Sequence, residues 1–370
     1  MRRFARTQVG CFEKDRRTDG SDAVLVYSPA WRKENFRFLT GSNFYGPFAL
    51  VLYLAQEDKI YIFHTSVYDA PRFANAMEGI AGILPANDRG AALTKLLREK
   101  HIKLLSISSG GLLPARVEDA VRIAGAKTCS AEGFIERERY CKTPQEVECL
   151  RKAVELADRA FPTFVDAICR GKNEFEIAAE VEYALKKMGA EDNFMLISTG
   201  QKEVFGMTPP QNRTAKPGDL VLTELTPQLN GWWCQICRTV VKGEPSETQK
   251  RIFSIFMEAE QAGLDMLRPG VNINDVAKAE NDVFRKYGYG DYITSQYTRV
   301  RGHGHGMHLD EAPTVNEGVD FVVEEGMVIV VHPNTYNPET GYMVMGDPVV
   351  VTADGYRMLS TTERKLFVAK

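Results

Sequence analysis

The feature that most constrains this chain's fold is a change in the order of its apolar runs near residue 139. Before that point, apolar runs of strand length at Ala23–Tyr27, Phe48–Leu54 and Lys59–Phe63 alternate with helical patterns at Gly90–Glu99 and Leu113–Ala124. Such alternation predicts an α/β domain whose sheet is covered by helices. Because 370 residues exceed what one core normally organises, we predict an N-terminal domain over residues 1–138 and a second domain over residues 139–370.

The second domain is predicted to be α+β, because its helices and strands come in separate runs. A helix is expected to begin at Thr143-Pro144, where a capping Thr precedes Pro at the first helical position. Leu229-Asn230-Gly231 predicts the turn of a hairpin between two apolar strands. The other predicted elements are helices at 174–188, 247–267 and 273–287 and strands at 220–225, 232–241, 327–332 and 341–352.

Charge and composition exclude several classes of partner. The formal net charge of -3 provides no field that would favour nucleic acid or an anionic membrane, and no apolar run approaches the length of a membrane-spanning helix. The segment Met1–Arg6 is basic but lacks the apolar core of a secretion signal, so a cytoplasmic location is expected. The seven cysteines have no repeated spacing, which indicates reduced thiols.

A cluster of histidines marks the candidate site. Of the six histidines, His303, His305 and His308 fall within six residues, and His332 ends the next apolar run. Imidazole changes its charge near neutral pH and is a common metal ligand. Glycines between these histidines let the backbone approach a ligand closely. Glu224 lies in an otherwise apolar strand, where a buried carboxylate must be paired or functional.

Several short motifs also occur in an order that a known superfamily shares. They are Phe38–Gly41 in the first domain and Arg139–Glu146, Lys216–Asp219, Arg238-Thr239, Gly302–Pro313, Gly326–Val328 and Val349–Gly355 in the second. On these motifs the chain resembles the creatinase, aminopeptidase P and prolidase superfamily, whose catalytic domain has the pita-bread fold. The resemblance covers nearly the whole chain. It implies an α/β N-terminal domain followed by an α+β pita-bread catalytic domain.

The same resemblance shows departures at the metal ligands. Metal-dependent members hold two divalent ions with five residues, and this chain has Glu224, Gln235, His303, His332 and Gly346 at those positions. Four carboxylates normally offset the charge of the two ions, and at least one bridges them. Only one carboxylate remains here, so we expect no dinuclear centre and no cofactor. A single iron or zinc ion held by Glu224, His303 and His332 stays an alternative.

The departures suggest a creatinase-like branch in which carboxylates and imidazoles act without metal ions. The predicted function is metal-independent hydrolysis of an amide, amidine or guanidinium-type C–N bond in a small polar, amino-acid-like metabolite. One of His303 and His332 would act as general base or acid, and Glu224 would anchor positive charge or act as a nucleophile. The alternatives are a lyase, isomerase or mononuclear-metal enzyme that uses the same cleft, and a peptide- or ligand-binding protein without activity.

Seven further residues are predicted to bind the small-molecule substrate. Arg301 could hold a substrate carboxylate in a bidentate pair, and Gln235 could hydrogen-bond the substrate. The others are His305 and His308 from the histidine cluster, and Met207, Asp310 and Tyr342, which the resemblance places near the cleft. Members of the creatinase branch usually form homodimers, so a homodimer is also predicted. Residues 43–45 are where the N-terminal domain would reach the partner's cleft.

Overall fold

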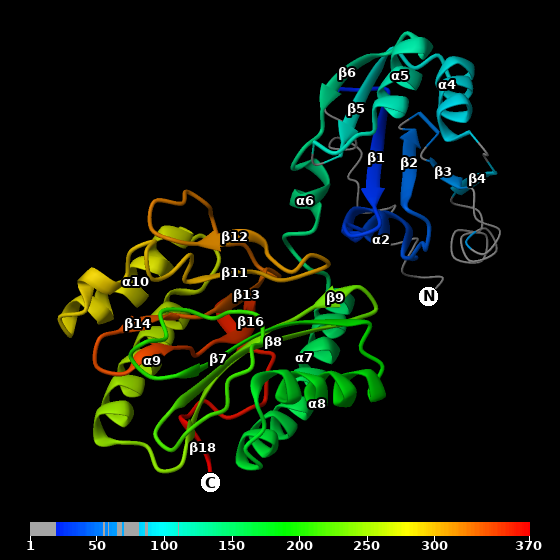
Figure 1. Ribbon diagram of the computed structural model, residues 1–370. Helices are drawn as coiled ribbons and strands as arrows, with labels where there is room; N and C mark the ends of the chain where they lie inside the picture. The colour runs from blue at the N-terminus through cyan, green and yellow to red at the C-terminus, as the bar shows by residue number, and fades with distance from the viewer. Residues whose placement is uncertain are drawn as a thin grey trace. The chain divides into compact units, whose positions relative to one another are not determined.

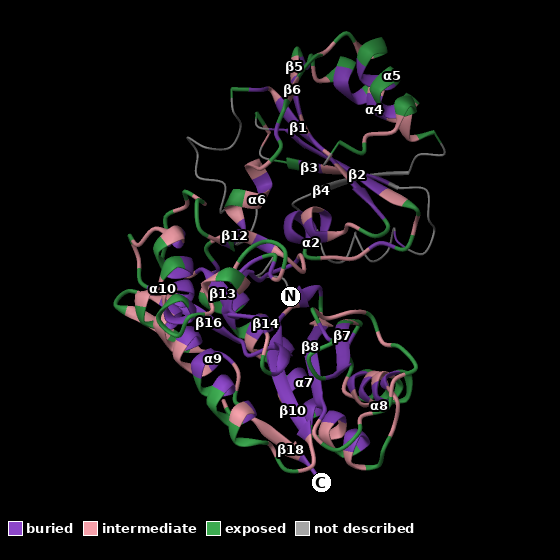
Figure 2. Cartoon of the chain, turned by 60° about the vertical axis from the view of Figure 1, so that its left-hand side comes forward, coloured by how far each residue is buried: buried purple, intermediate pink, exposed green. Residues whose placement is uncertain are grey.

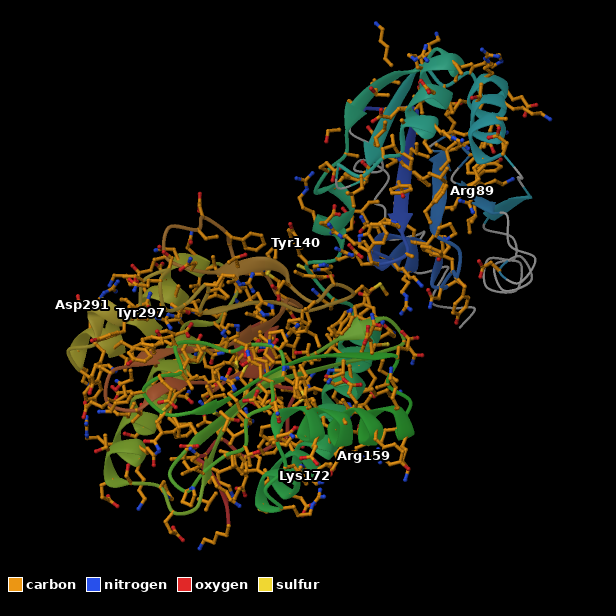
Figure 3. All side chains as sticks on the ribbon, viewed as in Figure 1. Arg89, Tyr140, Arg159, Lys172, Asp291 and Tyr297 are labelled. Carbon is orange, nitrogen blue, oxygen red and sulfur yellow. The ribbon has the colours of Figure 1, made fainter. Side chains whose placement is uncertain are left out.

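The structure is a computed structural model that describes residues 20–54, 56–57, 59–64, 69, 81–85, 88–109 and 111–370. The basic segment Met1–Arg6 lies outside the described residues. The chain divides into two compact units, Met1–Arg139 and Tyr140–Lys370, and Tyr140, the first residue of the second unit, is labelled in Figure 3. Among the described helices, none has the length and apolar character needed to cross a bilayer.

The first unit is built on a six-stranded mixed sheet with the order β4-β3-β2-β1-β5-β6 (Figure 1). β1 pairs antiparallel with β2 and parallel with β5. The strands are β1 (Ala23–Pro29), β2 (Phe48–Leu54), β3 (Lys59–His64), β4 (Ala81–Pro85), β5 (Leu104–Ser108) and β6 (Lys127–Ser130). The helices are α2 (Glu34–Thr40), α4 (Arg89–Glu99), α5 (Ala115–Ala124) and α6 (Phe134–Glu138).

Helices α4 and α5 cover one face of this sheet. Leu93 and Leu97 of α4 and Val117 and Val121 of α5 are buried in one apolar cluster with residues of β1, β2 and β5. Their spacing of four residues puts each pair on one side of its helix. The predicted α/β fold of the N-terminal half is therefore present.

The second unit contains two five-stranded sheets. The first has the order β18-β10-β8-β7, with β9 paired to β8, and the second has the order β12-β11-β13-β16-β17. The strands of the first sheet are β7 (Asp192–Gly200), β8 (Leu220–Leu229), β9 (Trp232–Trp233), β10 (Ile236–Lys242) and β18 (Phe367–Ala369). Those of the second are β11 (Gly302–Gly304), β12 (Glu311–Val315), β13 (Val328–Val331), β16 (Asp347–Thr352) and β17 (Gly355–Met358). A small hairpin, β14 (Thr335–Asn337) with β15 (Gly341–Met343), follows β13.

Four long helices pack on these sheets. They are α7 (Pro144–Cys169), α8 (Glu174–Lys187), α9 (Glu247–Met266) and α10 (Ile273–Lys286). α7 contacts β8 and β10, whereas α9 contacts β13 and β17. The strands of both sheets are mostly buried (Figure 2). Helices on sheets in this arrangement form the predicted α+β domain.

Helix starts follow from local sequence. Thr143 accepts a hydrogen bond from the backbone N–H of Glu146, whose side chain bonds back to Thr143, so a capping box starts α7. Ser246 and Gln249 form the same arrangement at the start of α9. Each box satisfies backbone donors that a helix start leaves without intrahelical partners.

Candidate active site

Glu224 lies in the middle of β8. Its neighbours Thr223 and Leu225, which point to the opposite face of the sheet, are fully buried, whereas Glu224 is half-buried. In the register of the first sheet, Glu224 lies opposite Cys237 of β10 and Leu196 of β7. The strand thus presents one carboxyl group on the face that carries Leu196 and Cys237.

His303 and His332 come from the second sheet. His303 lies in β11, between Thr314 of β12 and Val330 of β13, at a register shift in the β11–β12 pair. His332 directly follows β13. The imidazole ring centroids are 5.4 Å apart, with the ring planes at 70°.

The positions on either side of His303 have no room for a residue larger than glycine. A Cβ on Gly302 would lie 2.2 Å from the carbonyl oxygen of Val330, and one on Gly304 would lie 2.1 Å from that of Ala312. Both contacts are far shorter than real carbon–oxygen contacts. Glycine therefore lets β11 approach both neighbouring strands closely and fixes the position of the His303 ring.

These residues surround a pocket of about 440 Å³, named here the Glu224 pocket. Seven of the ten predicted site residues line it, namely Glu224, His303, His332, Gln235, Asp310, Met207 and Tyr342. The lining residues not predicted from sequence are Phe194, Leu196, Thr298, Arg299, Val300, Leu309 and Asn334. One part of the lining is therefore apolar, and the rest carries titratable, amide or hydroxyl groups.

The other three predicted residues do not line the pocket. Arg301 and His305 are almost fully buried, and His308 is half-buried. Arg301 donates from Nε to Asn281 Oδ1 at 2.6 Å and from Nη1 to the carbonyl of Asn334 at 3.0 Å. His305 packs edge-on against His303 with 4.9 Å between ring centroids. The prediction that Arg301 takes a substrate carboxylate is corrected, because its guanidinium is enclosed and bonded within the fold.

His303 sits between two hydrogen-bond acceptors. Its Nδ1 is 3.1 Å from the carbonyl oxygen of Gly304, and its Nε2 is 3.2 Å from Oδ1 of Asp310. A neutral imidazole has one N–H and cannot donate to both. Burial lowers the pKa of His303, and Asp310 opposes that shift. The neutral ring can therefore donate to only one of these two oxygens at a time.

Asp310 carries a second ion pair. One oxygen of its carboxylate accepts from Nη2 of Arg299 at 2.7 Å. Burial raises the pKa of Asp310, but His303 and Arg299 outweigh it, so the net pKa lies below the ordinary value. Asp310 is thus held as a carboxylate between a guanidinium and an imidazole.

Glu224 and His332 have strongly perturbed protonation. Burial, followed by the negative charge of Asp310, raises the pKa of Glu224 to about 7. Burial, followed by the charge of His303, lowers the pKa of His332 to about 3. At neutral pH the site therefore offers a carboxyl group close to half protonation and a neutral imidazole.

The second unit matches a known family of peptidases. The family model described as Metallopeptidase family M24 matches residues 148–353, which is more than half of the 370-residue chain. The chain belongs to this family. A relative from Bacillus subtilis, YkvY, is 30% identical over 359 residues, with 94% of this chain and 96% of that protein covered.

Other M24 relatives have names that state an activity. The Xaa-Pro dipeptidase of Pyrococcus furiosus is 34% identical over 230 residues, covering 62% of this chain and 65% of that protein. The chain therefore spans just under two thirds of that relative's length. The crystal structure of the prolidase from Pyrococcus horikoshii OT3 superposes with a TM-score of 0.83 at 26% identity, covering 98% of this chain and 99% of that one.

Membership in M24 confirms part of the sequence prediction and overturns part. The pita-bread fold, the prolidase and aminopeptidase P superfamily and the hydrolase class are confirmed. The predicted creatinase-like branch, with metal-independent cleavage of a C–N bond in a small metabolite, is wrong, because the family is one of metallopeptidases and its relatives here are Xaa-Pro dipeptidases. The prediction of no cofactor conflicts with the same finding and is withdrawn.

The donor set of this chain nevertheless does not fit a pair of metal ions. A Cβ on Gly346 would lie 2.5 Å from Cβ of His332, so no acidic side chain fits there while His332 keeps its place. The Gln235 amide is already engaged, since it accepts from Thr226 Oγ1 at 3.2 Å and donates to Cys237 Sγ at 3.1 Å. Within the described parts of the chain, no three His, Cys, Asp or Glu residues form a group that could hold a metal. No reaction step below is routed through a metal.

Proposed function

We propose that this chain is a dipeptidase that binds its substrate in the Glu224 pocket and hydrolyses the peptide bond. The observation that carries the proposal is the combination of charges in a peptidase-family pocket of dipeptide size. Glu224 and Asp310 supply negative charge, and Arg299 supplies positive charge, around a volume of about 440 Å³. A free dipeptide is a zwitterion, with an ammonium group at one end and a carboxylate at the other. Its two charges match those of the lining.

The ammonium group is assigned to Glu224. Asn334 donates to Oε1 of Glu224 at 3.1 Å, so Oε2 is the oxygen available to a ligand. A nearby cation also favours ionisation of this carboxyl group, whose pKa in the unliganded protein is about 7. Substrate binding should therefore convert Glu224 to its carboxylate form.

The carboxylate end of the dipeptide is assigned to Arg299. This guanidinium is exposed and contacts Asp310 from the rim of the pocket. It has five N–H donors in a planar fork, so it can keep Asp310 and also bind a carboxylate. Phe194, Leu196 and Met207 belong to the apolar part of the lining and would contact the substrate side chains.

Hydrolysis adds water across the peptide bond and requires that a proton reach the leaving amine. The chain can supply that movement from two places. Glu224, as the carboxylate formed when substrate binds, can accept a proton from the attacking water and pass it on toward the leaving amine. Nε2 of His303 lies 3.2 Å from Oδ1 of Asp310, close enough for a proton to pass between the two groups. His332, as a neutral ring on the same pocket, can accept a hydrogen bond from substrate or water.

The proposal is tested with a panel of dipeptides, both Xaa-Pro and non-prolyl, by measuring release of free amine. The protein is assayed as purified, after dialysis against a chelator, and after addition of Mn²⁺, Co²⁺ or Zn²⁺. Turnover of dipeptides but not of blocked dipeptides, which lack both terminal charges, is expected. Dipeptide binding without turnover in any metal condition would overturn the proposal in favour of a binding protein. The homodimer stays a prediction.

A further inference from the structure

Asn334 makes the one side-chain hydrogen bond to Glu224 that is of ordinary length among the described residues. Asn334 is only 2% exposed, and its amide has a partner at each end. Nδ2 donates to Glu224 Oε1 at 3.1 Å, and Oδ1 accepts from the backbone N–H of Met345 at 3.1 Å. Because the nitrogen end donates and the oxygen end accepts, only one orientation of the amide satisfies both hydrogen bonds.

The main chain of Asn334 is fixed as well. Its carbonyl accepts from Arg301 Nη1 at 3.0 Å, and Arg301 is itself only 1% exposed. The carbonyl of Arg301 in turn accepts from the backbone N–H of His332 at 2.9 Å. The guanidinium lies over the ring of Phe284, with 5.2 Å from Cζ to the centroid. Asn334 thus cannot shift without disturbing a buried cation and the segment that carries His332.

This contact joins the two sheets across the pocket. Glu224 belongs to β8 of the first sheet, whereas Asn334 follows β13 of the second. A half-buried glutamate on a strand has three side-chain torsions to restrict. Its other side-chain contact, from Cys237 Sγ at 3.9 Å, is weak. A charge-assisted bond from a fixed amide is therefore what holds Oε1 in place and directs the remaining oxygen.

We propose that Asn334 is a positioning residue that fixes the Glu224 carboxyl group for the substrate ammonium. The inference rests on the proposed dipeptide binding. Asn334 acts on ligand binding only through Glu224, so replacing Asn334 should weaken ligand binding only while Glu224 is present. Arg301 supports the same function by fixing the Asn334 carbonyl.

A double-mutant cycle tests this assignment. The probe is the ketomethylene analogue of alanyl-alanine, in which carbon replaces the amide nitrogen so that hydrolysis is impossible. Calorimetry measures its affinity for the wild type, Asn334→Ala, Glu224→Ala and the double variant. Asn334→Ala should weaken binding about tenfold in the wild-type background, the usual effect of losing a hydrogen bond to a charged group. In the Glu224→Ala background the same change should have less than about a twofold effect.

Asn337→Ala is the matched control, since Asn337 is another 2% exposed asparagine and bonds to the backbone of Glu339 instead. It should leave affinity unchanged. Equal loss on Asn334→Ala in both backgrounds would overturn the inference. If the wild type does not bind the probe, the dipeptide proposal fails first, and a crystal structure of Asn334→Ala then decides the inference. A Glu224 side chain that keeps one rotamer in that variant would overturn it, and several rotamers would support it.

Discussion

Replacing Glu224 by Gln should change how the protein's stability depends on pH. Burial and Asp310 raise the pKa of Glu224 from the ordinary 4.5 to about 7 in the folded state. Its folded form thus binds a proton that the unfolded chain releases between those two pH values. Stability contributed by this group is complete below pH 4.5 and falls as pH rises toward about 7. The Glu224→Gln variant would carry no such penalty, because an amide does not ionise in this range.

The size of the effect follows from the same two pKa values. The gap between 4.5 and about 7 is equivalent to about 3 kcal/mol. We expect about 2 kcal/mol in practice, because Glu224 is only half-buried and water in the pocket screens its charge. Glu224→Gln should therefore be more stable than the wild type by about 2 kcal/mol above neutral pH, and equal to it under acidic conditions.

Urea unfolding followed by tryptophan fluorescence measures this difference, since Trp232 and Trp233 belong to the pita-bread unit. The wild type and Glu224→Gln are compared at about pH 5 and about pH 8. Glu325→Gln, a change at an exposed glutamate, serves as the control, and its stability should follow that of the wild type at both pH values. A stability gap that is the same at both pH values would refute the reasoning. It would mean that folding does not raise the pKa of Glu224.

Three further outcomes follow from the buried ion pair, the glycines and the pocket rim. Asp347→Ala removes the carboxylate that lies 2.8 Å from the fully buried Arg238. It should lower the free energy of unfolding, measured in urea, by about 3–5 kcal/mol, and Asp347→Asn should lower it less. Gly302→Ala, whose Cβ would meet the Val330 carbonyl, should lose about 3 kcal/mol, whereas Gly206→Ala, in open space, should unfold like the wild type. Arg299→Ala should raise KM about tenfold for a dipeptide and leave KM for the dipeptide amide unchanged; equal effects on both substrates would exclude a carboxylate contact.

Much of the fold could be predicted because its signals are local. The Thr143-Pro144 start of α7 is a capping box read from adjacent residues, and the turn at Asn230-Gly231 follows from left-handed backbone at both positions. The histidines and Glu224 could also be proposed from local sequence, because the histidines cluster among glycines and Glu224 interrupts an apolar strand. Such local signals can be recognised in the sequence without knowing which strands are neighbours in the sheets.

Other features depend on contacts between distant segments. The bond from Asn334 to Glu224 joins residues 110 positions apart, and nothing beside Asn334 in sequence identifies its partner. Arg301 next to the histidine cluster resembles a ligand-binding arginine until the fold encloses it against Asn281. The link between Gly346 and His332 is also spatial, since the missing side chain leaves room for the imidazole. Taken as separate departures from the family's ligand set, Glu224, Gln235, His332 and Gly346 suggested a metal-free, creatinase-like branch of the superfamily.

The most direct test of the proposed dipeptidase is mass spectrometry of alanyl-proline after incubation with the protein in isotopically labelled water. Hydrolysis should release alanine that carries the labelled oxygen in its new carboxylate, together with unlabelled proline. Glu224→Gln should slow that release by at least about a hundredfold, because the amide can neither ionise nor accept the proton. Intact dipeptide after incubation with the wild type in every metal condition, or equal rates for the two proteins, would contradict the assignment of this pocket.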